Sequence, residues 1–248
     1  MIKIDGIPEL TDDVSWFPDP KTSLAARFAR GEVRVKHPSL AAVLENGLLA
    51  TGGDLNPERL LVAYSRGIFP WFAFRDELPR WYCPMDRFVI NPSEIHVSHS
   101  MRSLLNKGIY KFSIDTAFES VITSCALFDI NNQEDYRVNE YGAWLGPDIM
   151  EAYTKLHKMG VAHSVEVWNE NDELVGGLYG VVHNRCFMGE SMFSVIPNGS
   201  KMALIHLCRT LAEKGFLMVD CQFETPHLLS MGGRHISYDE YLNNLSQK

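Results

Sequence analysis

The sequence predicts an α+β fold, and three features of its second half carry that prediction. Residues 164–194 are typical of three consecutive antiparallel strands joined by short polar turns, and Gly176–Gly177 and Gly180 inside the second strand predict a bulge or a close backbone approach. An amphipathic helix is predicted at 200–214, and the apolar run 216–221 is predicted to be a fourth strand. This order of elements favours a mixed, mostly antiparallel sheet flanked by helices.

The composition is typical of a globular chain that works in a reducing compartment. Its 248 residues can form one large domain or a small domain joined to a medium one, and 46% hydrophobic residues suffice for a substantial core. Five cysteines, an odd number without a CxxC pair, argue against a disulfide framework. The N-terminus lacks the apolar core of a secretory signal and no run is long enough to span a membrane, so we expect a cytoplasmic protein.

The first part of the chain is expected to form short helices and loops. Helices are predicted at 24–30 and 39–45. The stretch 47–55 contains three glycines and is predicted to be a tight loop, but it has neither the GxGxxG pattern nor the lysine of a nucleotide-binding loop. Asn56-Pro57 is a typical helix start, and the helix is expected to end at Gly67.

A basic and aromatic segment follows within an acidic chain. The formal net charge is −8, yet residues 59–111 hold eight Lys and Arg against four Asp and Glu. Large aromatic residues gather at 68–72 and 81–82 beside several arginines. Two interpretations stay open: a packing cluster between domains with peripheral arginines, or a platform on which a nucleobase stacks while arginines contact phosphates.

The middle of the chain is predicted to be largely helical. Helices are expected at 100–106, 116–128 and 147–159, where apolar residues recur at helical spacing. The polar stretch 129–140 is predicted to be an exposed loop. A last helix is expected at 238–245.

Two carboxylates in apolar surroundings are candidates for chemistry. Glu190 stands in the Phe- and Met-rich strand 186–194, where an ionised side chain is costly unless a partner meets it. Asp220 ends the fourth strand, and Gln222 points to the same side if the chain stays extended. On neighbouring strands, the two carboxylates would meet over an apolar pocket and divide acid, base or cation-binding roles. The alternative for Glu190 is a structural salt bridge or a carboxylate facing solvent.

Two further constellations are weaker candidates. Cys221 with His227 could pair a thiolate with a base, but alternation along the strand points Cys221 at the core and favours a buried, inert thiol. His96 and His99 form an HxxH pair without a third ligand nearby in the sequence. We therefore predict no metal site.

A set of motifs in a fixed order runs through most of the chain. They are Gly47-Leu48-Leu49-Ala50, Gly52-Gly53-Asp54-Leu55, Arg66-Gly67-Ile68-Phe69-Pro70-Trp71-Phe72, Glu151-Ala152-Tyr153, His163-Ser164-Val165-Glu166-Val167-Trp168, Leu174-Val175-Gly176-Gly177, Gly189-Glu190-Ser191-Met192-Phe193-Ser194, Ser200-Lys201 and Asp220-Cys221-Gln222 with His227. With these motifs the chain resembles the leucyl/phenylalanyl-tRNA–protein transferases over about residues 47–245.

The resemblance implies a fold, a reaction and its partners. It implies a small N-terminal domain at 1–84, with a divergent segment at 1–46, and a GNAT-like acyltransferase domain at 85–248. The reaction would move Leu or Phe from Leu-tRNA or Phe-tRNA to a protein or peptide with N-terminal Arg or Lys, marking it for degradation under the N-end rule. We expect no cofactor, because the aminoacyl ester is already activated, and a monomer that binds no membrane.

The resemblance also implies roles for individual residues. Asp220, Gln222 and Glu190 are expected to be catalytic: the two carboxylates would meet the cationic acceptor, and Asp220 would act through Gln222 on the attacking amine. The residues expected at the terminal adenosine of the tRNA are Tyr64, Trp71, Trp144 and Tyr153. Those expected in the amino-acid pocket are Leu178, Phe187, Met192 and Phe193. The basic segment 59–111 would contact phosphates of the acceptor stem.

Two other functions stay open on the sequence alone. One is a GNAT-type acyltransferase with a different donor, such as an acyl-CoA, although no basic glycine-rich pyrophosphate loop precedes the helix at 200–214. The other is a non-catalytic RNA-binding module that uses only the aromatic and basic segment.

Overall fold

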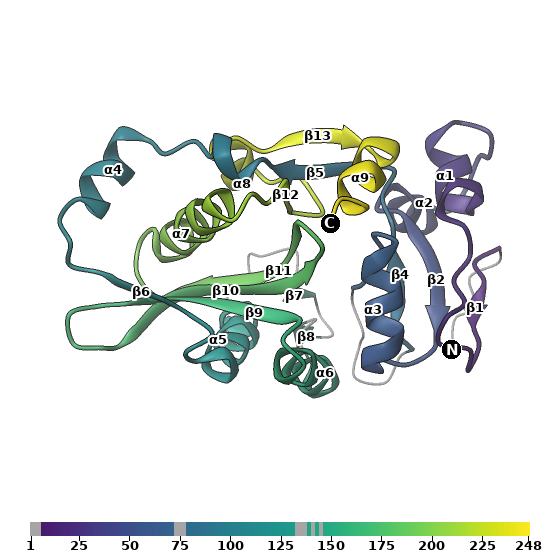
Figure 1. Cartoon of the computed structure of the whole chain (residues 1–248). Coiled ribbons are helices and arrows are strands. Elements are labelled where there is room, and N and C mark those ends of the chain that lie inside the picture. Colours follow the sequence, from purple (N-terminus) through teal and green to yellow (C-terminus); the bar gives the residue numbers. More distant parts are fainter. Residues whose placement is uncertain (1–5, 72–77, 132–137, 140–141, 144–145) are drawn as a thin grey trace.

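The computed structural model describes residues 6–71, 78–131, 138–139, 142–143 and 146–248. Within them the strands form a four-stranded sheet near the N-terminus, a seven-stranded sheet and a two-stranded sheet. Figure 1 shows the smaller sheet with α1, α2 and α3 at one end of the molecule and the larger sheet with its helices beside it. This arrangement confirms the α+β class, with a small N-terminal sheet ahead of a larger one.

The smaller sheet has the strand order β1–β2–β4–β3. Its strands are β1 (Glu9–Leu10), β2 (Leu48–Gly52), β3 (Phe69–Pro70) and β4 (Arg80–Tyr82). The helices around it are η1 (Pro20–Thr22), α1 (Leu24–Ala29), α2 (Pro38–Glu45) and α3 (Pro57–Ser65). Helices α1, α2 and α3 agree with the sequence prediction, whereas η1 and the short strands of this sheet were not predicted.

The prediction of a tight loop at 47–55 is wrong. Leu48 and Leu49 are buried in strand β2, which pairs with β4. Left-handed turns flank the strand, with φ angles of 83° at Gly47 before it and of 83° and 71° at Gly52 and Gly53 at its end. The last two glycines therefore end a buried strand, and the apolar residues before them supply part of the core.

Helix α3 begins and ends where the sequence predicts. The Asn56 side chain accepts a hydrogen bond of 3.0 Å from the backbone N–H of Glu58, and Gly67 follows the helix with a φ of 71°. A Cβ atom on Gly67 would lie 2.4 Å from the Tyr241 ring and 3.0 Å from the Arg87 guanidinium. Only glycine fits here. Because its neighbours Tyr241 and Arg87 belong to α9 and β5, the turn after α3 packs directly against the larger sheet.

The larger sheet is mixed and mostly antiparallel, as predicted. Its order is β13–β5–β12–β11–β10–β9–β6, and among the described strand pairs of this sheet only β11 with β12 runs parallel. Its strands are β5 (Asp86–Ile90), β6 (Lys111–Ile114), β9 (Ala162–Trp168), β10 (Leu174–His183), β11 (Cys186–Ser194), β12 (Met218–Asp220) and β13 (Arg234–Ser237). The sequence predicts β9 to β12 but misses the short strands β5, β6 and β13.

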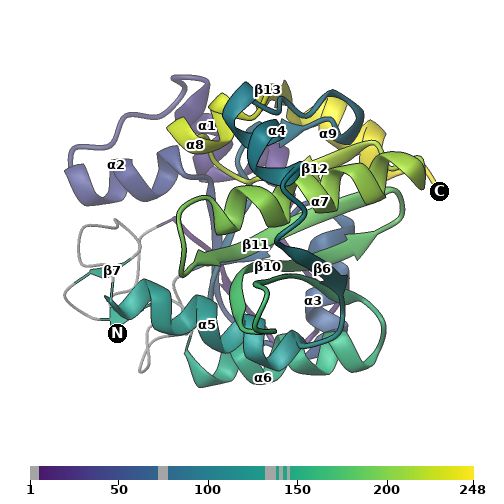
Figure 2. The ribbon, with the colours of Figure 1, turned by 90° about the vertical axis from the view of Figure 1, so that its left-hand side faces the viewer.

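Helices cover both faces of this sheet. Figure 2 shows α7 (Gly199–Glu213) on one side of β10 and β11, with α5 (Phe118–Asn131) and α6 (Pro147–Lys158) on the other. Side chains alternate between these faces: Leu178 packs with α7, whereas Tyr179 packs with α5 and α6. The remaining helices are η2 (Pro92–Glu94), α4 (His99–Leu105), α8 (Pro226–Ser230) and α9 (Tyr238–Leu245).

Every helix that the sequence predicts is present, with ends shifted by a few residues. None of the helices in the described part of the chain is long and apolar enough to cross a membrane. The predicted loop at 129–140 lies partly outside the described residues: α5 continues to Asn131, and β7 (Val138–Asn139) pairs with β8 (Gly142–Ala143).

The larger sheet is irregular where Glu190 lies. Tyr179 pairs with Ser191 and Gly180 pairs with Gly189, so Glu190 has no partner on β10 and forms a bulge. On its other side, β11 pairs with β12 only from Cys186 to Met188. The predicted bulge is therefore confirmed, and the end of pairing between β11 and β12 leaves room for a cavity.

Candidate active site

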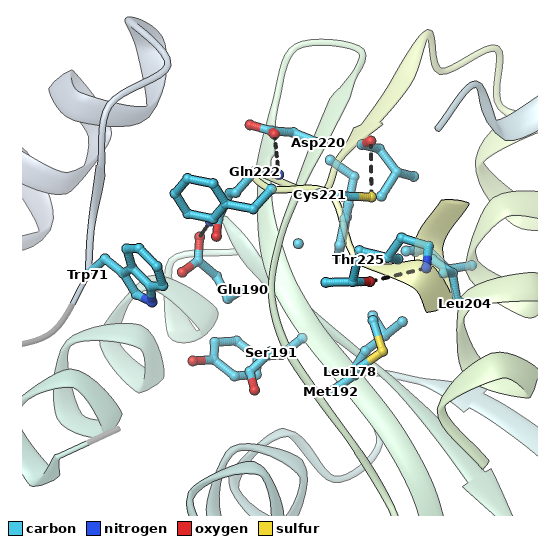
Figure 3. A pocket seen from close by; sticks show the side chains of 17 residues that line it. Trp71, Leu178, Glu190, Ser191, Met192, Leu204, Asp220, Cys221, Gln222 and Thr225 are labelled. Carbon is cyan, nitrogen blue, oxygen red and sulfur yellow. Dashed lines mark hydrogen bonds between the residues drawn. The ribbon is translucent and has the colours of Figure 1, made fainter. Parts of the chain in front are cut away.

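A cavity of about 120 Å³ opens where β11 and β12 cease to pair. Figure 3 shows Leu178, Met192 and Leu204 on one side of β11 and Trp71 and Glu190 on the other. An apolar cavity of roughly 150 Å³ can hold a benzene molecule, so this space is of the order of a single apolar side chain. The apolar residues that line it are Leu178, Phe187, Met192, Leu204, Leu207, Val219 and Leu228.

Three of the four residues predicted for the amino-acid pocket line this cavity; Phe193 does not. Successive residues of a strand face opposite sides, so Phe193 points away from Met192 and is buried among the side chains of α5 and α6. The sequence analysis misses Leu204 and Leu207 of α7 and Leu228 of α8. Leu204 and Leu207 could have been predicted, because they lie on the apolar face of the helix expected at 200–214.

Glu190 forms the polar side of the cavity and is 9% exposed. Its Oε1 accepts hydrogen bonds from the Tyr64 hydroxyl at 2.6 Å and from Gln222 Nε2 at 3.4 Å. Its Oε2 accepts one from the Tyr153 hydroxyl at 3.0 Å, and the two hydroxyls also bond to each other. Burial raises the pKa of Glu190 to about 8, although the two tyrosine hydrogen bonds lower it. In the described part of the chain, hydroxyls take the place of the salt bridge that the alternative interpretation expects.

Asp220 borders the same cavity but is 1% exposed and fully engaged. Its Oδ2 accepts a hydrogen bond of 2.9 Å from the Tyr241 hydroxyl and lies 3.6 Å from Arg87 Nη1. Its Oδ1 accepts a hydrogen bond of 2.8 Å from the backbone N–H of Gln222. Asp220 lies at the cavity, as the sequence predicts, but the buried cation that compensates its charge was not predicted.

That cation, Arg87 on β5, is fully buried. It donates a hydrogen bond to the Gly67 carbonyl oxygen, and its guanidinium carbon lies 4.5 Å from the centre of the Tyr241 ring and 5.1 Å from that of Phe69. Burial alone would lower the pKa of Arg87, but the Asp220 carboxylate and its neighbours hold that pKa above its ordinary value. Arg87 is therefore a permanent positive charge beside Asp220.

Gln222 does not extend the strand, contrary to the alternation argument. Strand β12 ends at Asp220, and Gln222 has a φ of 64°, a left-handed conformation that is uncommon outside glycine. The backbone N–H of Gln222 binds Asp220, while its side-chain amide reaches Glu190. Gln222 thus joins the two carboxylates by two different groups, and strain of this kind is frequent at functional sites.

Of the four residues predicted at the tRNA terminus, Trp71 borders the cavity directly. Its ring packs on Phe223 with centroids 4.7 Å apart. Tyr64 and Tyr153 are buried and bind the cavity carboxylate through their hydroxyls, so they form its support. Trp144 lies outside the described residues.

The basic segment 59–111 presents fewer cations than its composition indicates. Arg59 and Arg87 are fully buried, and Lys111 is bound to Asp172 at 2.6 Å. Trp81, at the centre of the aromatic stretch, is also fully buried. For these residues the packing interpretation is the correct one.

Cys221 lines the cavity as a half-buried thiol. Its Sγ donates to the carbonyl oxygen of Val219 at 3.7 Å, and burial raises its pKa well above the ordinary value, which disfavours a thiolate. The inert interpretation therefore fits better than a nucleophile paired with His227. Within the described residues, no group of three or more His, Cys, Asp or Glu side chains is placed to hold a metal ion.

Comparison with known proteins links this site to one family. Residues 89–246 match the family model "Leucyl/phenylalanyl-tRNA protein transferase", and residues 53–85 match the model of its N-terminal domain. The leucyl/phenylalanyl-tRNA–protein transferase of Nitrosomonas eutropha is 47% identical over 79% of this chain and 80% of its own length. That of Yersinia enterocolitica is 46% identical over 85% and 84%, and that of Hahella chejuensis 43% identical over 94% and 88%.

Similarity to solved structures is more remote. A protein described as "The structure of L-PGS from Bacillus licheniformis" aligns over 73% of this chain and 54% of its own, with 14% identity and a TM-score of 0.37, which is too low to support an inference. The family matches, together with an apolar pocket beside a buried carboxylate, define an aminoacyltransferase that uses tRNA. The chain belongs to the leucyl/phenylalanyl-tRNA–protein transferase family.

Proposed function

We propose that this chain transfers leucine or phenylalanine from its charged tRNA to the N-terminal arginine or lysine of an acceptor protein. The observation that carries the proposal is the apolar cavity of about 120 Å³ bordered by Glu190, in a chain of this family. The transferred side chain would occupy the apolar part. The ester carbonyl would then lie at the gap between β11 and β12, close to Glu190 and Gln222.

Trp71 is the surface on which the terminal adenosine of the donor would stack. The ring borders the cavity and is fixed in place by its packing on Phe223. Stacking of one base on an aromatic side chain contributes about 1–3 kcal/mol and does not depend on a particular sequence. A contact of this kind serves both donor tRNAs, because it is made at the end of the tRNA.

The acceptor would enter on the polar side of the cavity. Glu190 meets hydroxyls and an amide there, so in its ionised form its charge would be open to the ammonium of an acceptor N-terminus. An acceptor that begins with Asp or Glu would bring a second negative charge toward Glu190. This repulsion favours the cationic first residues Arg and Lys.

The reaction itself needs little beyond placement. The acceptor nitrogen attacks the ester carbonyl carbon, a C–N bond forms, and the C–O bond to the ribose breaks. Because the ester is already activated, holding the amine against it supplies much of the acceleration. No cofactor is required, the protein would act as a monomer, and the reaction belongs in the cytoplasm, where charged tRNA is present.

The test is transfer of labelled leucine from Leu-tRNA to peptides beginning with Arg, Lys, Asp or Ala. We expect labelled product with Arg and Lys and at least tenfold less with Asp and Ala, which corresponds to about 1.4 kcal/mol or more of discrimination. Acetyl-CoA in the same assay should neither compete nor acylate the peptide. Labelling of no peptide by intact protein that still binds tRNA would reject the proposal in favour of an RNA-binding module.

A further inference from the structure

The contacts of Glu190 require more protons than its partners supply. Three close oxygen pairs join three residues: Tyr64 with Glu190, Tyr153 with Glu190, and Tyr64 with Tyr153. Each hydrogen bond needs one proton between its two oxygens, and each tyrosine hydroxyl has one to give. Two hydroxyls therefore satisfy two of the three contacts, and a carboxylate has no proton for the third.

A proton on Glu190 completes the set. Glu190 then donates to Tyr153, Tyr153 donates to Tyr64, and Tyr64 donates back to the other carboxyl oxygen, which closes a ring of three hydrogen bonds. In a buried site such a closed set is worth more than isolated bonds, because each bond polarises the next. The arrangement thus corresponds to the neutral form of Glu190, the state that is reached when its carboxylate accepts a proton. The form that reacts is the carboxylate, in which one of the three contacts lacks its proton.

We propose that Glu190, in its ring with Tyr64 and Tyr153, takes the proton from the acceptor amine, and that Asp220 is a positioning residue. The proposal rests on the proposed function and assigns the proton step within it. The amine arrives as an ammonium and must lose one proton before its nitrogen can attack. The carboxylate of Glu190 receives that proton, and the ring closes as it does so.

Asp220 is unsuited to the same step because its charge is already in use. Both of its oxygens accept hydrogen bonds, and Arg87 lies 3.6 Å away with no exposure to water. A proton on Asp220 would leave the buried guanidinium of Arg87 without its counter-ion, which is strongly unfavourable. What Asp220 does provide is the hydrogen bond that holds the backbone of Gln222, whose side chain then reaches Glu190.

The groups that face Glu190 come from four elements. The hydrogen bonds with Tyr64 of α3 and Tyr153 of α6 lower its pKa, Asp220 of β12 raises it, and Arg87 of β5 lowers it. Burial is the largest effect and brings the pKa to about 8. An N-terminal amine has an ordinary pKa of about 7.7–8.0, so the proton moves between groups of nearly equal basicity.

The proton balance of one turnover is complete. The ammonium gives one proton to Glu190, and its nitrogen attacks the ester carbonyl carbon. The second proton of that nitrogen leaves with the ribose oxygen as the C–O bond breaks, so the tRNA departs with a free hydroxyl. Glu190 then releases its proton to water, and the net products are an amide, the uncharged tRNA and one proton.

The test compares two acceptors that differ only in their need to lose a proton. One is an Arg peptide, and the other is the same peptide with an aminooxy group in place of the terminal amine, which is already unprotonated at neutral pH. With the amine at pH 7, Glu190→Gln should lower kcat/KM by about 10²–10⁴-fold. With the aminooxy peptide the same variant should reach within about tenfold of the wild type, because glutamine preserves the hydrogen bonds and no first proton has to be removed.

The other variants separate a proton acceptor from a supporting residue. Asp220→Asn should lose activity by the same factor with both acceptors, because it displaces Gln222. The matched control is Glu166→Gln, since Glu166 on β9 is fully buried, accepts hydrogen bonds of 2.6 Å from Ser113 and Ser164, and lies outside the cavity. This control should keep the wild-type ratio of rates for the two acceptors.

Three kinetic outcomes would overturn the inference: an equal loss for Glu190→Gln with both acceptors, a loss below tenfold with the amine, or rescue of Asp220→Asn by the aminooxy peptide. A wild-type protein inactive with both peptides would instead reject the proposed function. Infrared spectroscopy of the free protein then still shows whether the carboxyl group of Glu190 carries a proton. A protonated carboxyl band at pH 6 that disappears in Glu190→Gln but persists in Glu166→Gln supports the ring, and its absence from the wild type rejects it.

Discussion

Two buried carboxylates border one cavity and have opposite surroundings. Asp220 is met by a buried guanidinium, a tyrosine hydroxyl and a backbone N–H. Glu190 is met by two tyrosine hydroxyls and an amide. Their exposures are similarly small, 1% and 9%, so burial does not distinguish them. The partners do: Asp220 faces a full counter-charge on Arg87, whereas Glu190 faces only the dipoles of hydroxyls and an amide.

The comparison also gives the two carboxylates different surroundings within one proposed site. Asp220 with Arg87 forms a rigid ion pair that anchors the turn at Gln222. The side-chain amide of Gln222 in turn donates a hydrogen bond to Glu190. In the proposed division, the ion pair of Asp220 and Arg87 holds the structure in place, and Glu190 accepts and releases the proton. The predictions below test this division, beginning with the largest expected effect.

The largest effect should follow removal of the cation. Arg87→Met leaves Asp220 buried without its counter-charge, and we expect the free energy of unfolding at pH 7 to fall by about 3–5 kcal/mol. Urea denaturation measures this. Adding Asp220→Asn to the same chain should recover part of the loss, because the uncompensated charge is then gone.

Arg59→Met is a matched control. Arg59 is also fully buried, but its partner Asp54 is 59% exposed and can be hydrated, so the loss of stability should be clearly smaller. Equal losses at the two arginines would contradict the ion-pair interpretation.

The second effect is a pH dependence of stability that belongs to Glu190. Its pKa is about 8 in the folded protein against an ordinary value of 4.5, so the folded state holds a proton that the unfolded state has released. This contribution is fully present below pH 4.5 and is lost as the pH rises through 8. Each pKa unit is worth about 1.4 kcal/mol, which amounts to a few kcal/mol over this window.

Glu190→Gln removes the titration, so its unfolding free energy should fall less between pH 5 and pH 8 than that of the wild type. Chemical denaturation at several pH values measures the two slopes. Glu151→Gln is the control, because Glu151 is exposed and a hydrogen bond with Lys155 lowers its pKa, so it titrates below this window. Parallel curves for wild type and Glu190→Gln would show that Glu190 is ionised in the folded protein.

A third prediction separates the apolar side of the cavity from both carboxylates. Leu204→Phe replaces a side chain that lines the cavity by a larger one and leaves less space, so it should reduce kcat/KM for Phe-tRNA more than for Leu-tRNA, by roughly 10–200-fold in the ratio. The dependence of transfer on pH should not change. Phe193→Leu is the control: it lies on the opposite face of β11, so it should alter stability but keep the ratio. A changed ratio in the control would mean that the cavity does not select the amino acid.

The smallest effects are expected on the free energy of unfolding when one tyrosine hydroxyl is removed from Asp220 or from Glu190. Tyr241→Phe removes a donor to an ion-paired carboxylate, and hydrogen bonds to charged groups contribute about 1.5–3 kcal/mol. Tyr153→Phe, measured at pH 6 where Glu190 is neutral, should cost about 1 kcal/mol, as for a bond between neutral groups. Thermal and urea unfolding measure both, and a larger loss for Tyr153→Phe would reverse the assignment of charge to the two networks.

The sequence was sufficient wherever local pattern decides structure. The helices, the meander of β9 to β11 and the strand β12 follow from periodicity, caps and turns. Glu190 stands out because an acidic residue inside a Phe- and Met-rich strand requires a partner. Three pocket residues, Leu178, Phe187 and Met192, were identified through the resemblance to the family. Phe193 was misplaced, although strict alternation along the strand puts it on the face opposite Met192.

What the sequence alone determined is therefore the family, the α+β class and the two carboxylates of the site. The tertiary structure alone decided their partners: Arg87 for Asp220, and two tyrosines for Glu190, one of them 126 residues away along the chain. It also decided that Gln222 turns out of the strand. The physical reason is that these contacts depend on strand register, on the bulge at Glu190 and on the packing of two sheets, which are set by the whole core and leave no periodic signal in the chain.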